Sequence, residues 1–306
     1  MNNSVGNVIL NYDYYNGCDY YSDGQIEDDM LDFVKSHSDM DYHEFVEKKR
    51  SWAGLYHLSP IRQNIVSGMD ISKDDNVLEI GAGCGAVTGR LCEMANKVTC
   101  IELSQKRSLI NAYRNKDKDN LSIIIGNFQD IVNGINEKYD VVTLIGVYEY
   151  AMSYIDDADP YHSFLEIIKS ITKPGGRIII AIENRLGMKY FAGCKEDHVG
   201  LYFEGIEGYT RTDNVRTFSK PELETILSDV GLSQFKFYYP YPDYKFPVSI
   251  FTDEHLPGKG DLNMNVVNID QDRQILFDES KAYDSIVGTG LFPIFSNSFL
   301  IEIINQ

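Results

Sequence analysis

Short apolar runs alternate with amphipathic stretches between residues 76 and 183. The apolar runs are short and mostly rich in β-branched residues, which favours buried strands; they are residues 77–80, 97–102, 121–125, 139–145 and 177–182. The stretches between them have a helical period, as in the i, i+3, i+4, i+7 spacing of apolar residues from Phe164 to Ile171. Strands that alternate with helices in this way predict an α/β fold with a doubly wound, mostly parallel sheet.

Later in the chain the pattern is less regular. Residues 184–216 have no clear period, and the four prolines within residues 240–257 favour a loop. Ser219 is followed three residues later by Glu222, a capping box that predicts the start of a helix. The closing residues 296–304 predict one further strand.

The charge of the chain disfavours polyanionic partners. It has 46 Asp and Glu residues against 28 Lys and Arg residues, a formal net charge of −18. Proteins that bind nucleic acid use Lys and Arg to neutralise phosphates, and an anionic membrane repels an acidic surface. We therefore expect no nucleic-acid partner and no membrane insertion.

Other features favour a cytoplasmic protein without a metal site. The longest apolar runs, such as residues 178–182, are far shorter than the roughly 18 residues of a membrane-spanning helix. The N-terminal residues lack the basic region and long apolar stretch of a signal peptide. The five cysteines include no C-x-x-C spacing, which favours reduced thiols over disulfides or a zinc site.

The first 47 residues have an unusual composition. They contain 11 acidic residues, one base and five tyrosines between positions 12 and 21. This aromatic content is high for a disordered acidic tail. Residues 1–50 are therefore interpreted as an N-terminal extension, which either packs its tyrosines on the main domain or serves as a cap or a contact in a homo-oligomer.

A glycine cluster follows the first predicted strand of the alternating region. Gly81 and Gly83 can adopt backbone angles that are barred to other residues. Because they lack side chains, a nucleotide-like ligand can lie against the main chain near the N-terminus of the next helix. Gly81-x-Gly83-x-x-Ala86 also fits the dinucleotide fingerprint, so a nicotinamide cofactor and a simple tight turn are the alternatives.

Polar residues after the neighbouring strands extend this candidate site. Glu79 precedes the glycines, and Glu102 ends the second strand 19 residues after Gly83. A carboxylate at that position can accept hydrogen bonds from two ribose hydroxyls, with either class of ligand. Asn127 and Phe128, directly after the third strand, offer an amide and an aromatic ring that could frame an adenine.

Together these motifs resemble those of class I S-adenosylmethionine (SAM) dependent methyltransferases. E-I-G-A-G-C-G is similar to their first motif, Glu102 to their ribose-binding acid, and Gly126-Asn127-Phe128 to their adenine contact, where Asp is commoner than Asn. K-P-G-G-R-I-I-I is similar to the turn and strand after their fourth helix, and S-N-S-F-L-I-E-I-I to their antiparallel seventh strand. The resemblance covers roughly residues 55–240.

The resemblance implies a Rossmann-like, seven-stranded sheet within residues 51–306, with acceptor-site insertions after strands five and six at about residues 184–216 and 241–292. It implies SAM as the cofactor and S-adenosylhomocysteine as its product. Tyr56 would touch the methionine end of SAM and Arg62 its carboxylate, with core packing or surface pairing as the alternative. The implied cofactor-binding residues are Tyr56, Arg62, Glu79, Gly81, Ala82, Gly83, Glu102, Leu103, Asn127, Phe128 and Gly146.

A closer resemblance concerns the acceptor. Y-H-L-S-P-I-R-Q-N-I, E-N-R-L-G-M-K-Y-F-A-G-C-K-E-D-H and F-Y-Y-P-Y-P-D-Y-K-F-P are similar to a subgroup found near, or fused to, glycosyltransferases in bacterial surface-polysaccharide loci. It implies polysaccharide biosynthesis and a small-molecule or glycan-related acceptor, methylated at an oxygen of a sugar or nucleotide sugar. The alternatives are an N-methyltransferase, a natural-product methyltransferase, a NAD-dependent oxidoreductase and a catalytically silent binding module.

Three candidate catalytic residues follow strands four and five. An alcohol acceptor needs a base, and His198, whose ordinary pKa is about 6.5, is the candidate, oriented by Glu196 or Asp197. Glu149 lies just beyond strand four at the expected ligand crevice, and Glu183 ends strand five at the same rim. The alternatives are a structural or surface histidine and a carboxylate that starts a helix.

Overall fold

A computed structural model describes residues 3–19, 21–38, 41–212, 214–265 and 272–306. The chain forms two compact units. The first unit comprises residues 1–144 and 169–177, and the second comprises residues 145–168 and 178–306. Each unit is described by itself below.

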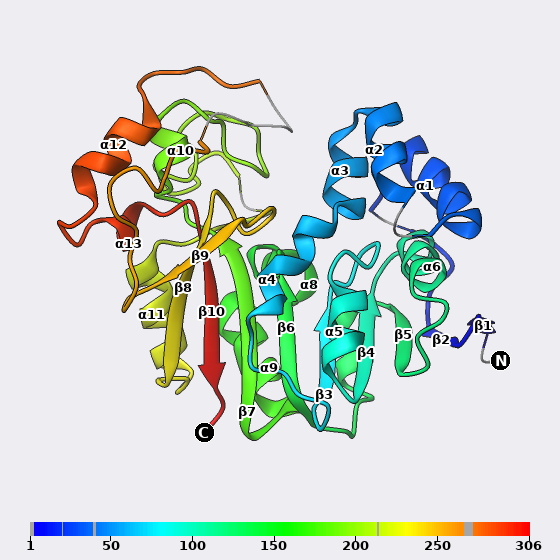
Figure 1. The fold of residues 1–306 in the computed structure, drawn as a ribbon. Helices are drawn as coiled ribbons and strands as arrows, with labels where there is room; N and C mark the ends of the chain where they lie inside the picture. Colours follow the sequence, from blue (N-terminus) through cyan, green and yellow to red (C-terminus); the bar gives the residue numbers. More distant parts are fainter. Residues whose placement is uncertain (1–2, 20, 39–40, 213, 266–271) are drawn as a thin grey trace. The chain divides into compact units, whose positions relative to one another are not determined.

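The first unit is built on a mostly parallel sheet (Figure 1). Four pairs of neighbouring strands are parallel, namely β2 with β5, β5 with β4, β4 with β3 and β3 with β6, whereas β1 and β2 are antiparallel. In spatial order the strands are β1 (Asn3–Val5), β2 (Val8–Tyr14), β5 (Leu121–Gly126), β4 (Lys97–Glu102), β3 (Asn76–Ile80) and β6 (Tyr139–Ile145).

Short helices connect these strands. Ser104 caps α6 by accepting a hydrogen bond from the Arg107 backbone N–H, and Asn127 caps α7 in the same way through Gln129. The helical elements are α1 (Gln25–Ser36), α2 (Tyr42–Lys49), α3 (Trp52–Leu58), η2 (Pro60–Gln63), α4 (Asn64–Ser67), α5 (Thr88–Met94), α6 (Gln105–Arg114) and α7 (Phe128–Val132).

The N-terminal segment is part of this unit. The sequence V-I-L-N of β2 buries Val8 and Leu10 and exposes Ile9, and β2 pairs in parallel with β5. Helix α1 packs on α6. The predicted boundary at residue 50 therefore does not coincide with the division between the two units.

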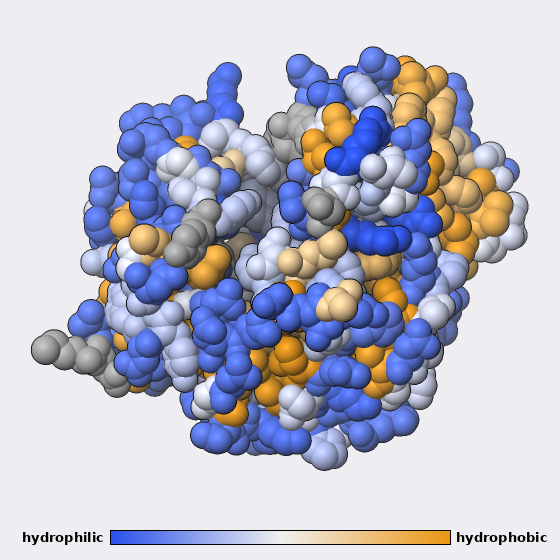
Figure 2. Space-filling model, turned by 180° about the vertical axis from the view of Figure 1, so that it is seen from behind, coloured by the Kyte–Doolittle hydropathy of each residue, from blue (hydrophilic) through white to orange (hydrophobic). Residues whose placement is uncertain are grey.

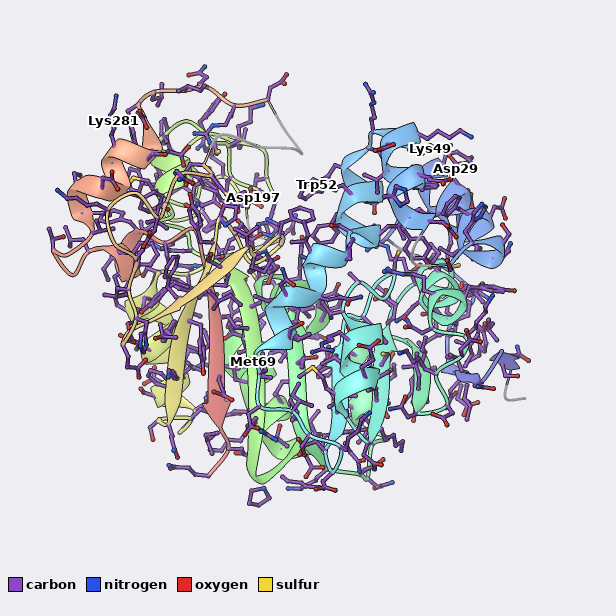
Figure 3. The ribbon with its side chains drawn as sticks, viewed as in Figure 1. Asp29, Lys49, Trp52, Met69, Asp197 and Lys281 are labelled. Atoms are coloured by element: carbon purple, nitrogen blue, oxygen red, sulfur yellow. The ribbon has the colours of Figure 1, made fainter. Side chains whose placement is uncertain are left out.

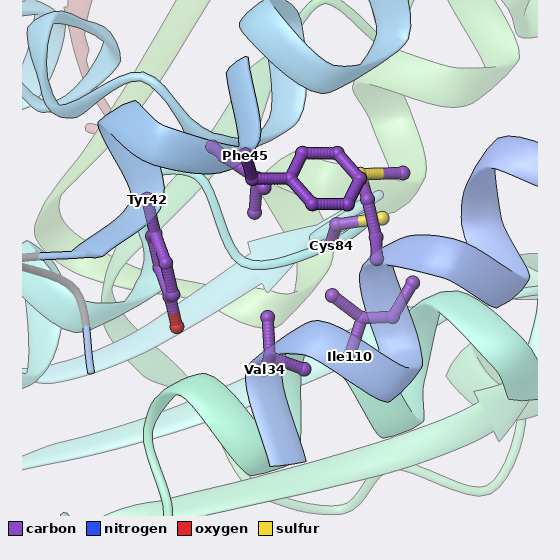
Figure 4. Packing of buried hydrophobic residues seen from close by; sticks show 7 residues of the cluster. Val34, Tyr42, Phe45, Cys84 and Ile110 are labelled. Atoms are coloured by element: carbon purple, nitrogen blue, oxygen red, sulfur yellow. The ribbon is translucent and has the colours of Figure 1, made fainter. Parts of the chain in front are cut away.

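An apolar cluster joins the N-terminal helices to the glycine turn (Figure 4). The thiol of Cys84, which lies inside the turn, is buried among side chains of α1, α2 and α6. Burial raises the pKa of this thiol far above its ordinary range, so Cys84 is a small core residue. The buried members are Met30, Val34, Tyr42, Phe45, Leu58, Cys84 and Ile110.

Charged contacts also bind the N-terminal segment to α6. The Asp19 carboxylate accepts hydrogen bonds from the backbone N–H groups of Gln105 and Lys106, at 2.7 and 3.1 Å. It therefore satisfies free donors in the first turn of α6. In the same turn of α6, Arg107 donates to Glu27 at 2.7 Å and to Asp23 at 2.8 Å.

The second unit combines strands with long connecting segments (Figure 1). Its strands, in spatial order, are β7 (Thr172–Glu183, of which residues 178–183 belong to this unit), β10 (Ser298–Ile304), β8 (Phe235–Tyr241) and β9 (Ser249–Thr252). Its helical elements are η3 (Tyr148–Tyr150), α8 (Ala151–Tyr154), α9 (Pro160–Ile171), α10 (Met188–Phe191), α11 (Lys220–Asp229), α12 (Glu279–Ile286) and α13 (Phe292–Phe295).

Strand β9 forms in the proline-containing segment that the sequence predicted to be a loop. It pairs with β8 through residues 238–241, so Pro240 lies opposite Ile250. Strand β10 pairs with β8 only through residues 235–238, in the antiparallel sense expected for the closing strand. Pro240 therefore lies beyond the part of β8 that is paired on both sides, where a missing N–H is tolerated.

The Rossmann-like α/β fold predicted from the sequence is confirmed, with more than seven strands among the described residues. The extra strands β1 and β2 come from the N-terminal segment and β9 from the loop after β8. The face drawn in Figure 2 is mostly hydrophilic. Among the described residues, every helix is too short or too polar to cross a bilayer.

Candidate cofactor site and a buried carboxylate–histidine cluster

The turn after β3, in the first unit, has backbone that neighbouring side chains leave uncovered at Gly83. Gly81, Gly83 and Gly85 all have positive φ angles, of 68°, 53° and 78°. Their conformation is strained for residues with a side chain. A Cβ atom placed on Gly83 would have no heavy atom within 4 Å, whereas one on Gly85 would meet the Asn111 side chain at 2.3 Å. The turn thus has room for a ligand at Gly83 and packs tightly against α6 at Gly85.

Glu102 faces this turn from the end of β4. One carboxylate oxygen accepts the Gly83 N–H at 2.8 Å and the other accepts the Ser104 N–H at 2.9 Å. Burial raises the pKa of Glu102, although these hydrogen bonds and Arg107 favour its charged form. Each oxygen retains a lone pair that can accept a ribose hydroxyl. The geometry therefore fits the predicted ribose-binding role, next to the half-buried Leu103.

Glu79 is engaged inside the fold. Its carboxylate accepts hydrogen bonds from the Thr88 hydroxyl at 2.6 Å and from the Cys100 thiol at 3.2 Å. Burial raises the pKa of Glu79 to about 7. These contacts connect β3 to α5 and β4, so Glu79 has a structural role. A contact between Glu79 and the cofactor stays a prediction.

Asn127 and Phe128 lie where β5 ends and α7 begins. The Asn127 side-chain oxygen accepts the Gln129 N–H at 2.9 Å, which fixes the orientation of the amide. The remaining part of that amide is a hydrogen-bond donor, unlike the Asp that is commoner at this position in the resembling enzymes. Phe128 is buried at the first residue of the helix.

Tyr56 and Arg62 contact each other. The Arg62 guanidinium lies 4.1 Å from the centre of the Tyr56 ring, and Arg62 is buried. Such a cation–π contact stabilises packing. It agrees with core packing, which was the alternative to a role of these two residues in binding SAM. Their contact with the methionine part of SAM stays a prediction.

Gly146 belongs to the second unit and has a different neighbour from Gly83. It has a φ of 72°, and a Cβ atom there would meet the Tyr244 hydroxyl at 2.7 Å. The space beside Gly146 is therefore filled by a side chain of the same unit. The structure supplies no open surface at Gly146 itself to support its predicted cofactor contact.

The three predicted catalytic residues come together in the second unit. Glu149 lies in η3, Glu183 ends β7 and His198 lies in the segment after α10. The His198 Nε2 atom is 3.7 Å from a Glu149 oxygen and 3.6 Å from a Glu183 oxygen. Both glutamates are fully buried, so the fold positions three ionisable groups around one small volume.

Glu196 orients the imidazole. Its carboxylate accepts the His198 Nδ1–H at 2.9 Å, together with the backbone N–H groups of His198 and Val199 and the Tyr209 hydroxyl. Asp197, labelled in Figure 3, instead accepts from Lys189 at 2.6 Å and Lys245 at 3.0 Å. Of the two orienting carboxylates considered from the sequence, the structure selects Glu196.

The environment changes the acid–base chemistry of this cluster. Burial disfavours a charged His198, but the carboxylates of Glu183, Glu149 and Glu196 outweigh that effect and raise its pKa well above the ordinary value of 6.5. Burial and the Glu183 charge raise the pKa of Glu149. This shift favours the charged imidazolium form over the free base that the ordinary pKa of histidine led us to expect.

Lys245 is a member of the site that sequence reasoning missed. Its ammonium group pairs with the Glu183 carboxylate and with Asp197. It lies within the F-Y-Y-P-Y-P-D-Y-K-F-P motif, 62 residues from Glu183 in the chain. The motif could have drawn attention to Lys245, because this basic residue lies between two aromatic residues and had no assigned role.

Comparison with known proteins gives a family match within the first unit, together with relatives and solved structures of similar sequence or fold. A family model described as ribosomal RNA adenine dimethylase matches residues 59–138. Ribosomal RNA small subunit methyltransferase A of Clostridium acetobutylicum is 35% identical over 82 residues, which are 27% of this chain and 30% of that protein. The protein of the same name from Borrelia garinii subsp. bavariensis is 25% identical over 154 residues, 50% of this chain and 55% of its own length.

The chain thus spans less than two thirds of the length of these relatives. Among solved structures, a SAM-dependent methyltransferase from Archaeoglobus fulgidus has a TM-score of 0.47 and 14% sequence identity, with 86% of this chain and 99% of that chain covered.

The comparisons correct one prediction from the sequence. Net charge led us to exclude a nucleic-acid partner, and the resemblance to the polysaccharide-locus subgroup led us to expect a small-molecule or glycan-related acceptor. The matched family and relatives are named for ribosomal RNA, which contradicts that exclusion. Net charge misled because it averages over the whole chain, whereas the likeness to these proteins is carried by a segment of it.

Proposed function

We propose that the chain is a SAM-dependent methyltransferase, with the SAM site formed by the turn at residues 81–85 and by Glu102. The observation that carries this proposal is the Glu102 carboxylate held against the open, positive-φ backbone of Gly83. Support comes from the family model, whose match over residues 59–138 includes both groups.

The residues of the first unit fit the parts of SAM. The backbone at Gly83 admits the ligand because no side chain fills that space. Glu102 binds the ribose hydroxyls through its two oriented oxygens, and the Asn127 amide donates a hydrogen bond to an adenine ring nitrogen. When bound, SAM supplies a methyl group on a sulfonium, so the chain mainly has to align an acceptor with it.

RNA is the acceptor class that we propose to test first, because the matched relatives are named for ribosomal RNA. The net charge of −18 slows the approach of a polyanion at low ionic strength. We therefore expect the rate of an RNA reaction to rise with moderate salt, unlike that of a protein with a basic surface. The polysaccharide-locus subgroup, cytoplasmic location and homo-oligomer stay predictions from the sequence.

Calorimetry with S-adenosylhomocysteine tests the cofactor site. We expect saturable binding that Glu102→Ala weakens by about 10- to 100-fold, since hydrogen bonds to a charged group contribute about 1.5–3 kcal/mol. Glu93→Ala, at an exposed carboxylate of α5, is the matched control and should bind normally. NADH should give no heat. Absence of binding by the wild-type chain, or equal binding by Glu102→Ala, would refute the proposal.

Transfer of a radioactive methyl group from SAM tests the acceptor. Ribosomal RNA from cells that lack the small-subunit adenine dimethylase should become labelled, and the label should remain after protease digestion. Digestion to nucleosides then identifies the methylated base. Labelling of a protein or glycan fraction, with unlabelled RNA, would exclude RNA as the acceptor and leave the cofactor site intact.

A further inference from the structure

We propose that Glu149, Glu183 and His198, in the second unit, together bind one divalent transition-metal cation such as Mn²⁺. The three residues can each direct one ligand atom to a shared point, because these atoms all lie within 4.8 Å of one another. The cation would be held by two carboxylate oxygens and one imidazole nitrogen. This site is independent of the proposed SAM site, and its test does not require methyl transfer.

The unsatisfied oxygens of the cluster point to a missing ligand. The Glu149 Oε2 and Glu183 Oε2 atoms are buried and make no hydrogen bond, and their residues are 1% and 0% exposed. A buried oxygen of a charged group that lacks a hydrogen-bond partner destabilises the folded chain. A fold retains such atoms where another species satisfies them, and a cation does so for both at once.

The distances suit a small cation. The His198 Nε2 atom lies 3.7 Å from the Glu149 Oε1 atom and 3.6 Å from the Glu183 Oε2 atom. A cation with bonds of about 2.0–2.2 Å to nitrogen and oxygen brings neighbouring ligand atoms to roughly 3–4 Å from one another. The ligand atoms, which lie within 4.8 Å of one another, would draw together as they bind an ion.

A second layer of contacts orients the candidate ligands. The His198 Nδ1–H donates to Glu196 at 2.9 Å, which leaves Nε2 facing the two glutamates. A carboxylate behind the imidazole is the usual support of a metal-binding histidine. On the Glu183 side, Lys245 pairs with one carboxylate oxygen. Glu149 is fixed through its backbone oxygen, which accepts from Tyr161 and Arg216.

The charges around the cluster do not balance without an added cation. Five buried or nearly buried carboxylates lie in one connected network with two ammonium groups and one imidazole; they are Glu149, Glu183, Glu196, Asp197 and Asp243, with Lys189, Lys245 and His198. Even a protonated imidazole leaves an excess of negative charge. Buried charges are stable when they are paired or bind a metal, and a divalent ion supplies the missing positive charge.

The ligand set indicates which ion. Carboxylates suit Mg²⁺, Ca²⁺ and Mn²⁺, whereas imidazole suits the transition metals. Mn²⁺, Fe²⁺ and Zn²⁺ all accept such a mixed set, and Mn²⁺ is the ion that we use as the probe, whereas Mg²⁺ should bind less tightly because it prefers oxygen ligands alone. Three protein ligands leave coordination positions for water or for an oxygen of another molecule, such as a hydroxyl or a phosphate.

Titration of the full-length chain with Mn²⁺, followed by the EPR signal of the free ion, tests this site. We expect about one ion to bind per chain. Glu149→Gln and Glu183→Gln keep the side-chain shape and should each abolish binding. Glu196→Gln, behind the histidine, should weaken it by roughly 10- to 100-fold. Glu204→Gln changes another buried carboxylate of the same unit, which pairs with Arg211, and should bind normally.

Circular dichroism of the metal-free variants separates loss of binding from loss of folding, and a variant that unfolds is replaced by His198→Gln. The inference is overturned if the wild-type chain binds no Mn²⁺. It is also overturned if the variants at residues 149, 183 and 198 bind as well as the wild type, because the ion is then elsewhere. Loss of binding in Glu204→Gln to the same extent has the same meaning.

Discussion

Each unit contains a buried network of charged side chains, and the two networks differ in how completely they are paired. In the first unit, Arg107 donates to Glu27 and Asp23, and His57 contacts Asp23 at 2.9 Å. The other Glu27 oxygen accepts the Ser22 hydroxyl at 2.6 Å. Both Glu27 oxygens therefore have partners inside the protein, and the network holds the N-terminal segment on α6.

In the second unit the network is incomplete. Glu149 and Glu183 each keep one buried oxygen without a hydrogen bond, and negative charges outnumber positive ones. Burial alone does not distinguish a structural charge network from a binding site. The distinguishing feature is whether the protein itself satisfies every buried polar atom. By that criterion the Arg107 network serves stability and the Glu149 cluster serves a ligand.

Substitution of Arg107 should have the largest effect. Arg107→Met would leave the fully buried Glu27 carboxylate without its cation, and such a loss costs about 3–5 kcal/mol. Arg90→Met removes an exposed ion pair with Glu93 and should cost about 0–1 kcal/mol. Urea unfolding of both variants measures the difference. Equal stabilities would show that the Arg107 network is not structural.

Mn²⁺ should stabilise the protein through the incomplete network. At 100 times its dissociation constant, an ion that binds only the folded chain adds about 2.7 kcal/mol. The unfolding midpoint in urea should therefore rise for the wild type and for Arg90→Met, and stay constant for Glu149→Gln. If the unfolding midpoint of Glu149→Gln rose by the same amount, Mn²⁺ would be stabilising the chain through other carboxylates.

The free energy of unfolding of the chain should fall in acid because of two groups in the Arg107 network, His57 and Asp23. Burial lowers the pKa of His57 from 6.5, so the unfolded chain binds that proton first and stability falls as pH drops below about 6.5. The hydrogen bond from His57 and the charge of Arg107 lower the pKa of Asp23 from 3.8, so a second loss begins as pH falls through that value.

Each group contributes at most about 1.4 kcal/mol per pH unit. The test compares the unfolding free energy of the wild type and His57→Gln between pH 5 and 8, in roughly half-unit steps. His57→Gln should lack the upper part of the decline, because its side chain does not titrate. Parallel curves would assign that part to other groups.

Glu149→Gln should have the smallest effect on the metal-free chain. It removes one of two neighbouring buried carboxylates whose charges repel each other. We expect the unfolding free energy to stay within about 1 kcal/mol of the wild type, or to rise. A loss as large as that of Arg107→Met would show that Glu149 is a paired structural residue, contrary to the comparison above.

Local patterns predicted the alternating region well. The runs at residues 97–102 and 139–145 correspond to β4 and β6 as observed, and the capping box begins α11 at Ser219. The glycine turn and Glu102 could be placed because both follow directly from strand ends in a parallel sheet. These features depend on residues that are close in the chain or on neighbouring strands.

Features that depend on distant partners could not be predicted. Strand β2 pairs with β5, which lies more than 100 residues away in the chain. The K-P-G-G-R-I-I-I motif was assigned to a turn followed by a strand, but β7 already begins at Thr172 and includes Pro174, Gly175 and Gly176. Likewise, the raised pKa of His198 results from Glu183 and Glu149, whose proximity only the folded chain creates.

The contact of Asp19 with α6 limits where the chain can be cut. The family model matches residues 59–138, and a truncated fragment could be designed around that segment. Such a truncation would strip the first turn of α6 of its acceptor and leave Arg107 with neither carboxylate. The stretch that the family model matches therefore lacks several of the contacts that stabilise α6 in the whole chain.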